Sequence, residues 1–118
     1  GVGKSLHEAD LLDAARAIVA KASARGASIP LPLDVVTAPA FAADAPATVE
    51  GIGTVSADEM ILDVGSTSVE ALGDVLKTCR TLVWNGPLGA FEIAPFDTAT
   101  VGRSSRQCEK LQRYCGKR

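Results

Sequence analysis

The chain has 118 residues, of which 47% are apolar, and a formal net charge of −2. These values limit it to one domain and exclude the strongly basic class of nucleic-acid-binding proteins. No apolar run reaches the roughly 18 residues of a membrane span, and no secretory signal is visible. One His and three Cys fit neither a zinc site nor a disulfide framework. We therefore expect a cytoplasmic protein with reduced thiols, and neither a nucleic-acid nor a membrane partner.

The first predicted element is an amphipathic helix. Ser5 and Glu8 have the spacing of a capping box, and apolar residues then recur every three or four positions. This pattern predicts about five helical turns, with Gly26 as the stop. Residues 3–5, Gly-Lys-Ser, also match the end of a phosphate-binding loop, but the preceding strand and glycine of that motif are not in the sequence. A capped helix start is therefore the preferred interpretation.

Strand candidates follow the helix. Val35 and Val36 are the best, because Pro30 and Pro32 before them cannot donate to a ladder. A weaker candidate lies at residues 47–49, and Met-Ile-Leu-Asp-Val at 60–64 is a third.

The next predicted elements are a helix from about residue 66 to Cys79, opened by good N-cap residues, and a buried strand at 81–84. Strands that alternate with helices predict an α/β fold, here a partial doubly wound parallel sheet with helical crossovers. In such sheets ligands bind beyond the carboxyl ends of the strands.

Two loops have that position. Residues 65–68 join Asp63 to a helix start that could attract an anion, although a plain strand-to-helix turn is the favoured interpretation. Residues 85–89, Asn-Gly-Pro-Leu-Gly, offer the polar amide of Asn85 and two flexible glycines, with the Glu92 carboxylate nearby. From the residues alone, a ligand loop and a structural turn are equally supported here.

Beyond residue 101 the composition changes. Residues 1–101 contain six Lys or Arg and 13 Asp or Glu, whereas residues 102–118 contain six Lys or Arg and one Glu. We interpret 102–118 as a basic divergent tail that is disordered or read in a shifted frame, with a true basic tail for an acidic partner as the alternative.

Four segments carry a family resemblance. Trp-Asn-Gly-Pro-Leu-Gly-Ala-Phe-Glu at residues 84–92 resembles the signature of phosphoglycerate kinase, and residues 3–6, 31–36 and 60–65 resemble that family in the same order. The resemblance covers residues 1–101. It implies an internal fragment of the C-terminal nucleotide-binding lobe, which in this family is Rossmann-like.

The resemblance also implies a function. Family members are glycolytic, cytoplasmic and usually monomeric enzymes that transfer a phosphoryl group between 1,3-bisphosphoglycerate and ADP, with Mg²⁺, to give 3-phosphoglycerate and ATP. By this resemblance Glu92 would bind the ribose, and Asn85, Pro87 and Gly89 would line the phosphate and adenosine side. The backbone of Ile61 would lie near the adenine.

Three parts of the family's active site are absent from the sequence. These are the lysines that hold the nucleotide phosphates, the carboxylate that binds magnesium and the lobe that binds 3-phosphoglycerate. Phosphoryl transfer depends on positioning and charge neutralisation, so we assign no catalytic and no metal-binding residue and expect an inactive chain. The alternative is a non-catalytic truncated module, for example a protein-interaction fragment.

Overall fold

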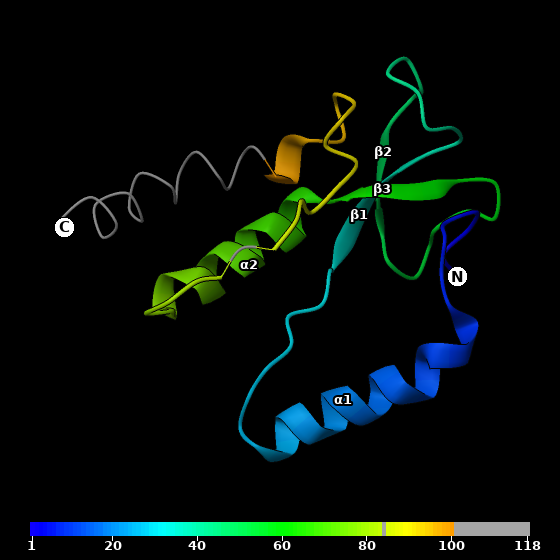
Figure 1. Ribbon diagram of the computed structural model, residues 1–118. Helices are drawn as coiled ribbons and strands as arrows, with labels where there is room; N and C mark the ends of the chain where they lie inside the picture. Colours follow the sequence, from blue (N-terminus) through cyan, green and yellow to red (C-terminus); the bar gives the residue numbers. More distant parts are fainter. Residues whose placement is uncertain (84, 101–118) are drawn as a thin grey trace, which may run out of the picture.

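The computed structural model describes residues 1–83 and 85–100. In chain order its elements are η1 (Ala9–Leu11), α1 (Leu12–Ala24), β1 (Asp34–Ala38), β2 (Thr48–Gly51), β3 (Met60–Val64) and α2 (Ser66–Thr78). Figure 1 shows α2 leaving the end of β3, while α1 forms an arm joined to β1 by a long connection. Helices combined with a sheet confirm the predicted α/β class.

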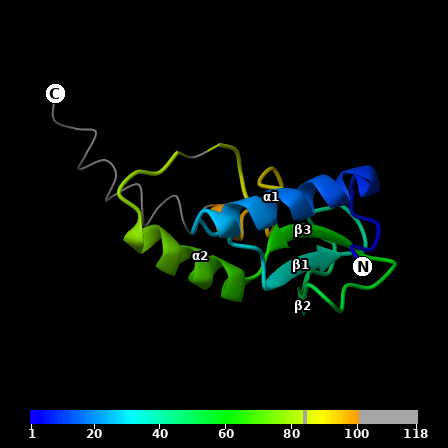
Figure 2. The same ribbon diagram turned by 90° about the horizontal axis from the view of Figure 1, so that it is seen from below.

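The sheet is antiparallel, so the predicted parallel strand direction is wrong for the described strands. Its order is β2-β1-β3, as Figure 2 shows from below, and β1 pairs antiparallel with both neighbours. A parallel pair needs a crossover of about a dozen residues, usually a helix. Residues 39–47 and 52–59 connect the three strands without any helix, so the helical crossovers that we predicted between strands are absent from this sheet.

The predicted first helix forms, but it begins differently. Gly26 has a φ of +70° just after α1, which confirms it as the stop. The predicted capping box is not formed: Glu8 precedes η1 without a side-chain cap. The Ser5 hydroxyl instead accepts the Ile61 N–H at 2.8 Å, and thereby ties the N-terminal segment to β3.

The apolar stripe of α1 is not covered by the described residues. Leu11, Leu12, Ile18 and Val19 are all exposed, and no residue of α1 is buried. The core lies elsewhere, between β1 and the residues after α2. Its buried apolar members are Val35, Ala38, Phe96 and Ala99. The segment after α2 is therefore a structural part of the core.

The second predicted helix is confirmed as α2, with Cys79 as its C-cap. The strand predicted at 81–84 is not: residues 81–83 are irregular, and Trp84 lies outside the described residues. Val83 is largely exposed, and a strand needs a neighbour to satisfy its backbone groups. No neighbouring strand pairs with residues 81–83 in the described sheet.

Candidate functional site

The free edge of β3 receives the residues that follow α2. We call residues 85–100 the return segment; Figure 1 shows this yellow and orange part coming back to the junction of β3 and α2. The pairing of β1 with β3 shifts register between Val36 and Thr37, so Leu62 has no Cα partner in β1. Bulges of this kind redirect backbone groups. The Leu62 carbonyl accepts the Ala90 N–H at 2.7 Å and anchors the return segment.

Two further contacts hold the return segment in place. The Leu88 N–H donates to the Thr100 hydroxyl at 3.0 Å, so the two ends of the segment are joined. Gly89 packs so closely against the Asp63 carboxylate and the Phe96 carbonyl that a Cβ at this position would collide with both. A glycine is therefore needed at residue 89 for space. The predicted close backbone approach at Gly89 occurs, but toward Asp63.

Asp63 is the buried charge beneath the return segment. Its side chain is 2% exposed, and its two oxygens accept the N–H groups of Val64 at 2.8 Å and Ala99 at 3.1 Å. Burial raises the pKa of Asp63 above its ordinary 3.8; the two N–H donors oppose this shift, and the nearby Asp97 adds to it. The carboxylate therefore links β3 to the far end of the return segment at an electrostatic cost.

A second buried carboxylate, Asp34, lies at the start of α2. Its Oδ1 accepts the Ser68 N–H at 2.7 Å and lies 2.6 Å from the Ser68 hydroxyl, while its Oδ2 accepts the Thr67 N–H at 3.0 Å. Burial alone would raise the pKa of Asp34, but the hydrogen bonds from Ser68 and Thr67 outweigh it and lower the pKa to about 2. Asp34, the first residue of β1, thus supplies the N-terminal cap of α2.

This cap decides between the two interpretations of residues 65–68. The helix start does attract an anion, but that anion is the chain's own Asp34 side chain. A Cβ on Gly65 would also collide with this carboxylate, so the space beside the turn is filled. The favoured interpretation, a strand-to-helix turn without a bound ligand, agrees with this geometry.

The chain is similar to proteins of one family over nearly its whole length. The family model described as "Phosphoglycerate kinase" matches residues 1–113. The chain belongs to the phosphoglycerate kinase family. Over 100 residues it is 61% identical to the phosphoglycerate kinase of Sphingopyxis alaskensis and 62% identical to that of Rhizorhabdus wittichii; each match covers 85% of this chain and 25% of the relative.

A solved structure agrees with these relatives. The phosphoglycerate kinase of Coxiella burnetii superposes with a TM-score of 0.85 at 40% identity, covering 89% of this chain and 27% of that chain. The chain therefore spans about a quarter of the length of the phosphoglycerate kinases it matches. The family match extends past residue 101, where we placed the boundary of the tail. Residues 102–118 lie outside the described part, and the division at 101 stays a prediction.

The five residues expected to touch a nucleotide in a phosphoglycerate kinase fall into two groups. Asn85, Pro87 and Glu92 are exposed on the return segment, whereas Gly89 and Ile61 are partly buried. The return segment meets β3 through the residues beside Gly89 and Ile61. The Ile61 N–H already donates to Ser5, so a nucleotide contact through that group would have to displace the serine.

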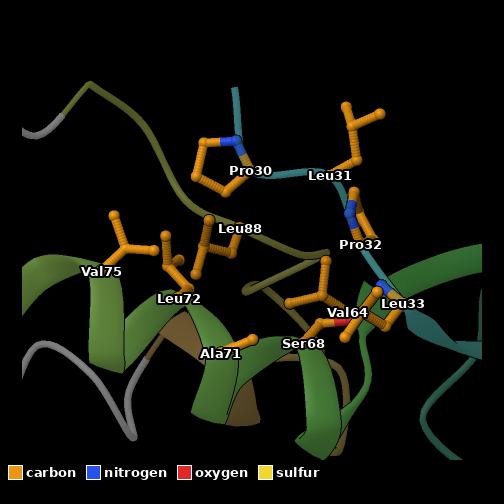
Figure 3. Close-up of a pocket in the computed structure, with 10 residues that line it drawn as sticks. All are labelled: Pro30, Leu31, Pro32, Leu33, Val64, Ser68, Ala71, Leu72, Val75 and Leu88. Carbon is orange, nitrogen blue, oxygen red and sulfur yellow. The ribbon is translucent and has the colours of Figure 1, made fainter. Parts of the chain in front are cut away.

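An apolar groove of about 280 Å³ lies beside the return segment. Figure 3 shows it between the proline-rich residues before β1, one face of α2, and the side chains of Val64 and Leu88. Ligand pockets usually combine apolar walls with a few polar groups that fix orientation. The polar side chain in this lining is Ser68, whose hydroxyl is engaged with Asp34. None of the five predicted nucleotide residues lines the groove, so we regard it as packing surface.

Several residues that shape this site were not predicted to hold the return segment or the cap of α2, although Asp63 and Ser68 were named at the helix start. Asp34, Asp63, Ser68 and Thr100 form it through contacts that span from 12 to 36 positions along the chain. Asp63 stands in an otherwise apolar strand. Burying a lone carboxylate is costly unless it is hydrogen-bonded. The single Asp in this apolar run was therefore the sequence signal that Asp63 has hydrogen-bond partners.

The described part of the chain offers neither a metal cluster nor a membrane span. Within residues 1–83 and 85–100, no three His, Cys, Asp or Glu side chains converge as metal ligands do. Across the same ranges no helix has the length and apolarity needed to cross a bilayer.

Proposed function

We propose that this chain forms the nucleotide side of a phosphoglycerate kinase and contacts ADP or ATP through its return segment. The observation that carries the proposal is that the return segment is anchored on β3 by the Ala90–Leu62 hydrogen bond and closed on itself by the Leu88–Thr100 hydrogen bond. These two bonds fix the backbone at Leu88 and Ala90, between Pro87 and Glu92. A loop that is already ordered loses less entropy when it binds a ligand.

The proposed contacts follow the family resemblance. Glu92 would accept hydrogen bonds from the ribose hydroxyls, because its carboxylate is exposed and has only acceptor atoms. Asn85, Pro87 and Gly89 would line the phosphate and adenosine side, and the backbone at Ile61 would face the adenine. Gly86, with a φ of +86°, lets the chain turn between Asn85 and Pro87.

The whole reaction would require groups beyond those described. In the intact enzyme that we propose, this segment would act with a magnesium-bound nucleotide and with 3-phosphoglycerate, in a cytoplasmic and monomeric protein. The described residues include no cluster that could hold the magnesium. We therefore propose no step of phosphoryl transfer for this chain and expect it to bind nucleotide weakly, at best in the millimolar range.

Titration of the ¹⁵N-labelled chain with ADP and Mg²⁺ tests this proposal. We expect saturable chemical-shift changes at the amides of residues 85–92 and weaker binding in Glu92→Gln. Glu70→Gln, an exposed carboxylate on α2, is the matched control and should bind as the parent chain does. Absence of saturable shifts up to tens of millimolar ADP would refute the proposal. It would favour the non-catalytic module.

A coupled assay for ATP formation completes the test. The expected result is no turnover above background with 1,3-bisphosphoglycerate and ADP, because transfer needs a lobe that binds 1,3-bisphosphoglycerate and lysines that hold the nucleotide phosphates, and the family resemblance assigns neither to this chain. Turnover that increases in proportion to the amount of purified chain would overturn our proposal that the chain carries only the nucleotide side of the active site.

A further inference from the structure

We propose that Asp63 is a positioning residue that holds the return segment, with its proposed nucleotide contacts, against β3. We call this attachment the seating of the return segment. This inference rests on the proposed function for its nucleotide readout, but the seating itself can be measured without any nucleotide. Asp63 touches the return segment at two separate points: it accepts the Ala99 N–H, and it packs against Gly89. Asn85, Pro87 and Glu92, which we propose contact the nucleotide, lie on the return segment on either side of Gly89. A carboxylate that holds this segment at Gly89 and at Ala99 therefore determines their position.

The chemistry of the contact requires an acceptor on both oxygens. The Val64 and Ala99 N–H groups both point at the Asp63 carboxylate. An asparagine has one acceptor oxygen and one NH₂ group, so it would face one of these donors with a donor. A buried N–H that is left without an acceptor destabilises the conformation that buries it. Asp63→Asn therefore leaves either the Val64 or the Ala99 N–H facing a donor, and so weakens the contact with almost no change in volume.

The contact between Gly89 and Asp63 also restricts the residue at position 89. A Cβ at residue 89 would collide with Asp63 and with the Phe96 carbonyl, which lies 2.6 Å from its position. Phe96 is fully buried, so the segment cannot move toward its own core to make room. The Asp63 carboxylate thus occupies the space that a side chain at position 89 would need.

Amide hydrogen exchange in the 118-residue chain tests the seating. In Asp63→Asn we expect the Ala90 and Leu88 amides, which do not touch Asp63, to exchange at least about tenfold faster, relative to the amides of the β1–β3 ladder. The ladder amides report global opening and so correct for lost stability. Unchanged relative exchange at both amides would overturn the proposal.

Two controls separate positioning from general destabilisation. Asp34→Asn disturbs a comparably buried carboxylate and should loosen the start of α2 while the relative exchange of Ala90 stays unchanged. If Asp63→Asn does not fold, Gly89→Ala attacks the same contact from the loop, and Gly65→Ala is its counterpart against Asp34. Faster relative exchange at Leu88 and Ala90 in Gly89→Ala alone supports the proposal; equal effects in both glycine variants refute it.

The nucleotide readout completes the design. When only a fraction of the molecules has a seated loop, the apparent Kd for ADP with Mg²⁺ rises by the inverse of that fraction. We expect Asp63→Asn to raise this Kd at least about threefold and Asp34→Asn to leave it unchanged. If the parent chain binds no ADP, the proposed function fails while exchange still decides the seating. An unchanged Kd despite a loosened loop would show that Asp63 does not position the nucleotide residues.

Discussion

The two buried carboxylates of this chain, Asp34 and Asp63, occupy similar places and have opposite electrostatics. Each lies on a strand, each packs against a glycine that has no room for a Cβ, and each joins segments more than 30 positions apart. The pKa of Asp34 is lowered to about 2, whereas the pKa of Asp63 is raised above 3.8. Burial acts in the same direction on both, so the hydrogen-bond donors make the difference.

The donors differ in number and in origin. Asp34 faces the first turn of α2, where the Thr67 and Ser68 N–H groups and the Ser68 hydroxyl converge on it. Helix N-termini carry partial positive charge and favour a carboxylate. Asp63 receives only two N–H groups in its described contacts, from Val64 and from Ala99 in the helical turn that begins at Thr98, and Asp97 repels its charge. Three donors at one helix start thus lower the pKa of a buried carboxylate, whereas two donors beside a like charge do not.

Asp34→Ala is the change with the largest expected effect on stability. It leaves the Thr67 and Ser68 N–H groups without their acceptor, while the Ser68 hydroxyl keeps the Asp34 carbonyl, so we expect a loss of about 3 kcal/mol in the free energy of unfolding. Asp63→Ala should cost less, about 1–2 kcal/mol, because the lost charge was itself unfavourable. Urea unfolding followed by circular dichroism measures both. A larger loss in Asp63→Ala would reverse the comparison.

The sequence predicted the local elements better than their long-range arrangement. The helix around Ile18 and the strands at Val35 and residues 60–64 were predictable, because hydrophobic periodicity is a local signal. The strand direction was not, because it depends on how the connections between strands fold. The strand expected at residues 81–84 was wrong in its described part, since an apolar run becomes a strand only beside a partner.

The site shows the same division between local and distant signals. Glycines and a polar loop at residues 85–89 were visible in the sequence, and the structure anchors that loop on β3. The residues that hold it there were not visible, because Asp63 and Ala99 are 36 positions apart. Likewise, Ser68 was recognised as a good N-cap residue, but the cap itself comes from Asp34, 34 positions earlier.

The pH dependence of stability should have opposite signs at the two carboxylates. Asp34 has a folded pKa of about 2, below the ordinary 3.8, so its contribution is complete above 3.8 and is lost as pH falls toward 2. That contribution is about 2 kcal/mol. Asp63 has a raised folded pKa, so its contribution favours the folded state below 3.8 and is lost as pH rises through the folded pKa.

Unfolding free energies of the parent chain, Asp34→Asn and Asp63→Asn between pH 2.5 and 7 measure these slopes. The stability of the parent relative to Asp34→Asn should grow as pH rises to about 4. Its stability relative to Asp63→Asn should shrink as pH rises above about 4. Slopes of the same sign in both differences would show that the two carboxylates do not differ as the structure indicates.

Arg16→Gln is the change with the smallest expected effect. It tests whether burial is the reason that the two carboxylates contribute strongly to the free energy of unfolding. Arg16 donates to Asp13 at 2.9 Å, a distance within the range of 2.6 to 3.0 Å found at Asp34, but the side chains are 75% and 93% exposed. Water and salt screen such a pair, and exposed pairs contribute about 0–1 kcal/mol. We expect a loss below about 0.5 kcal/mol in urea unfolding, and less still in 0.5 M salt. A loss as large as that of Asp63→Ala would mean that hydrogen-bond geometry, and not exclusion of water, sets the strength of these contacts.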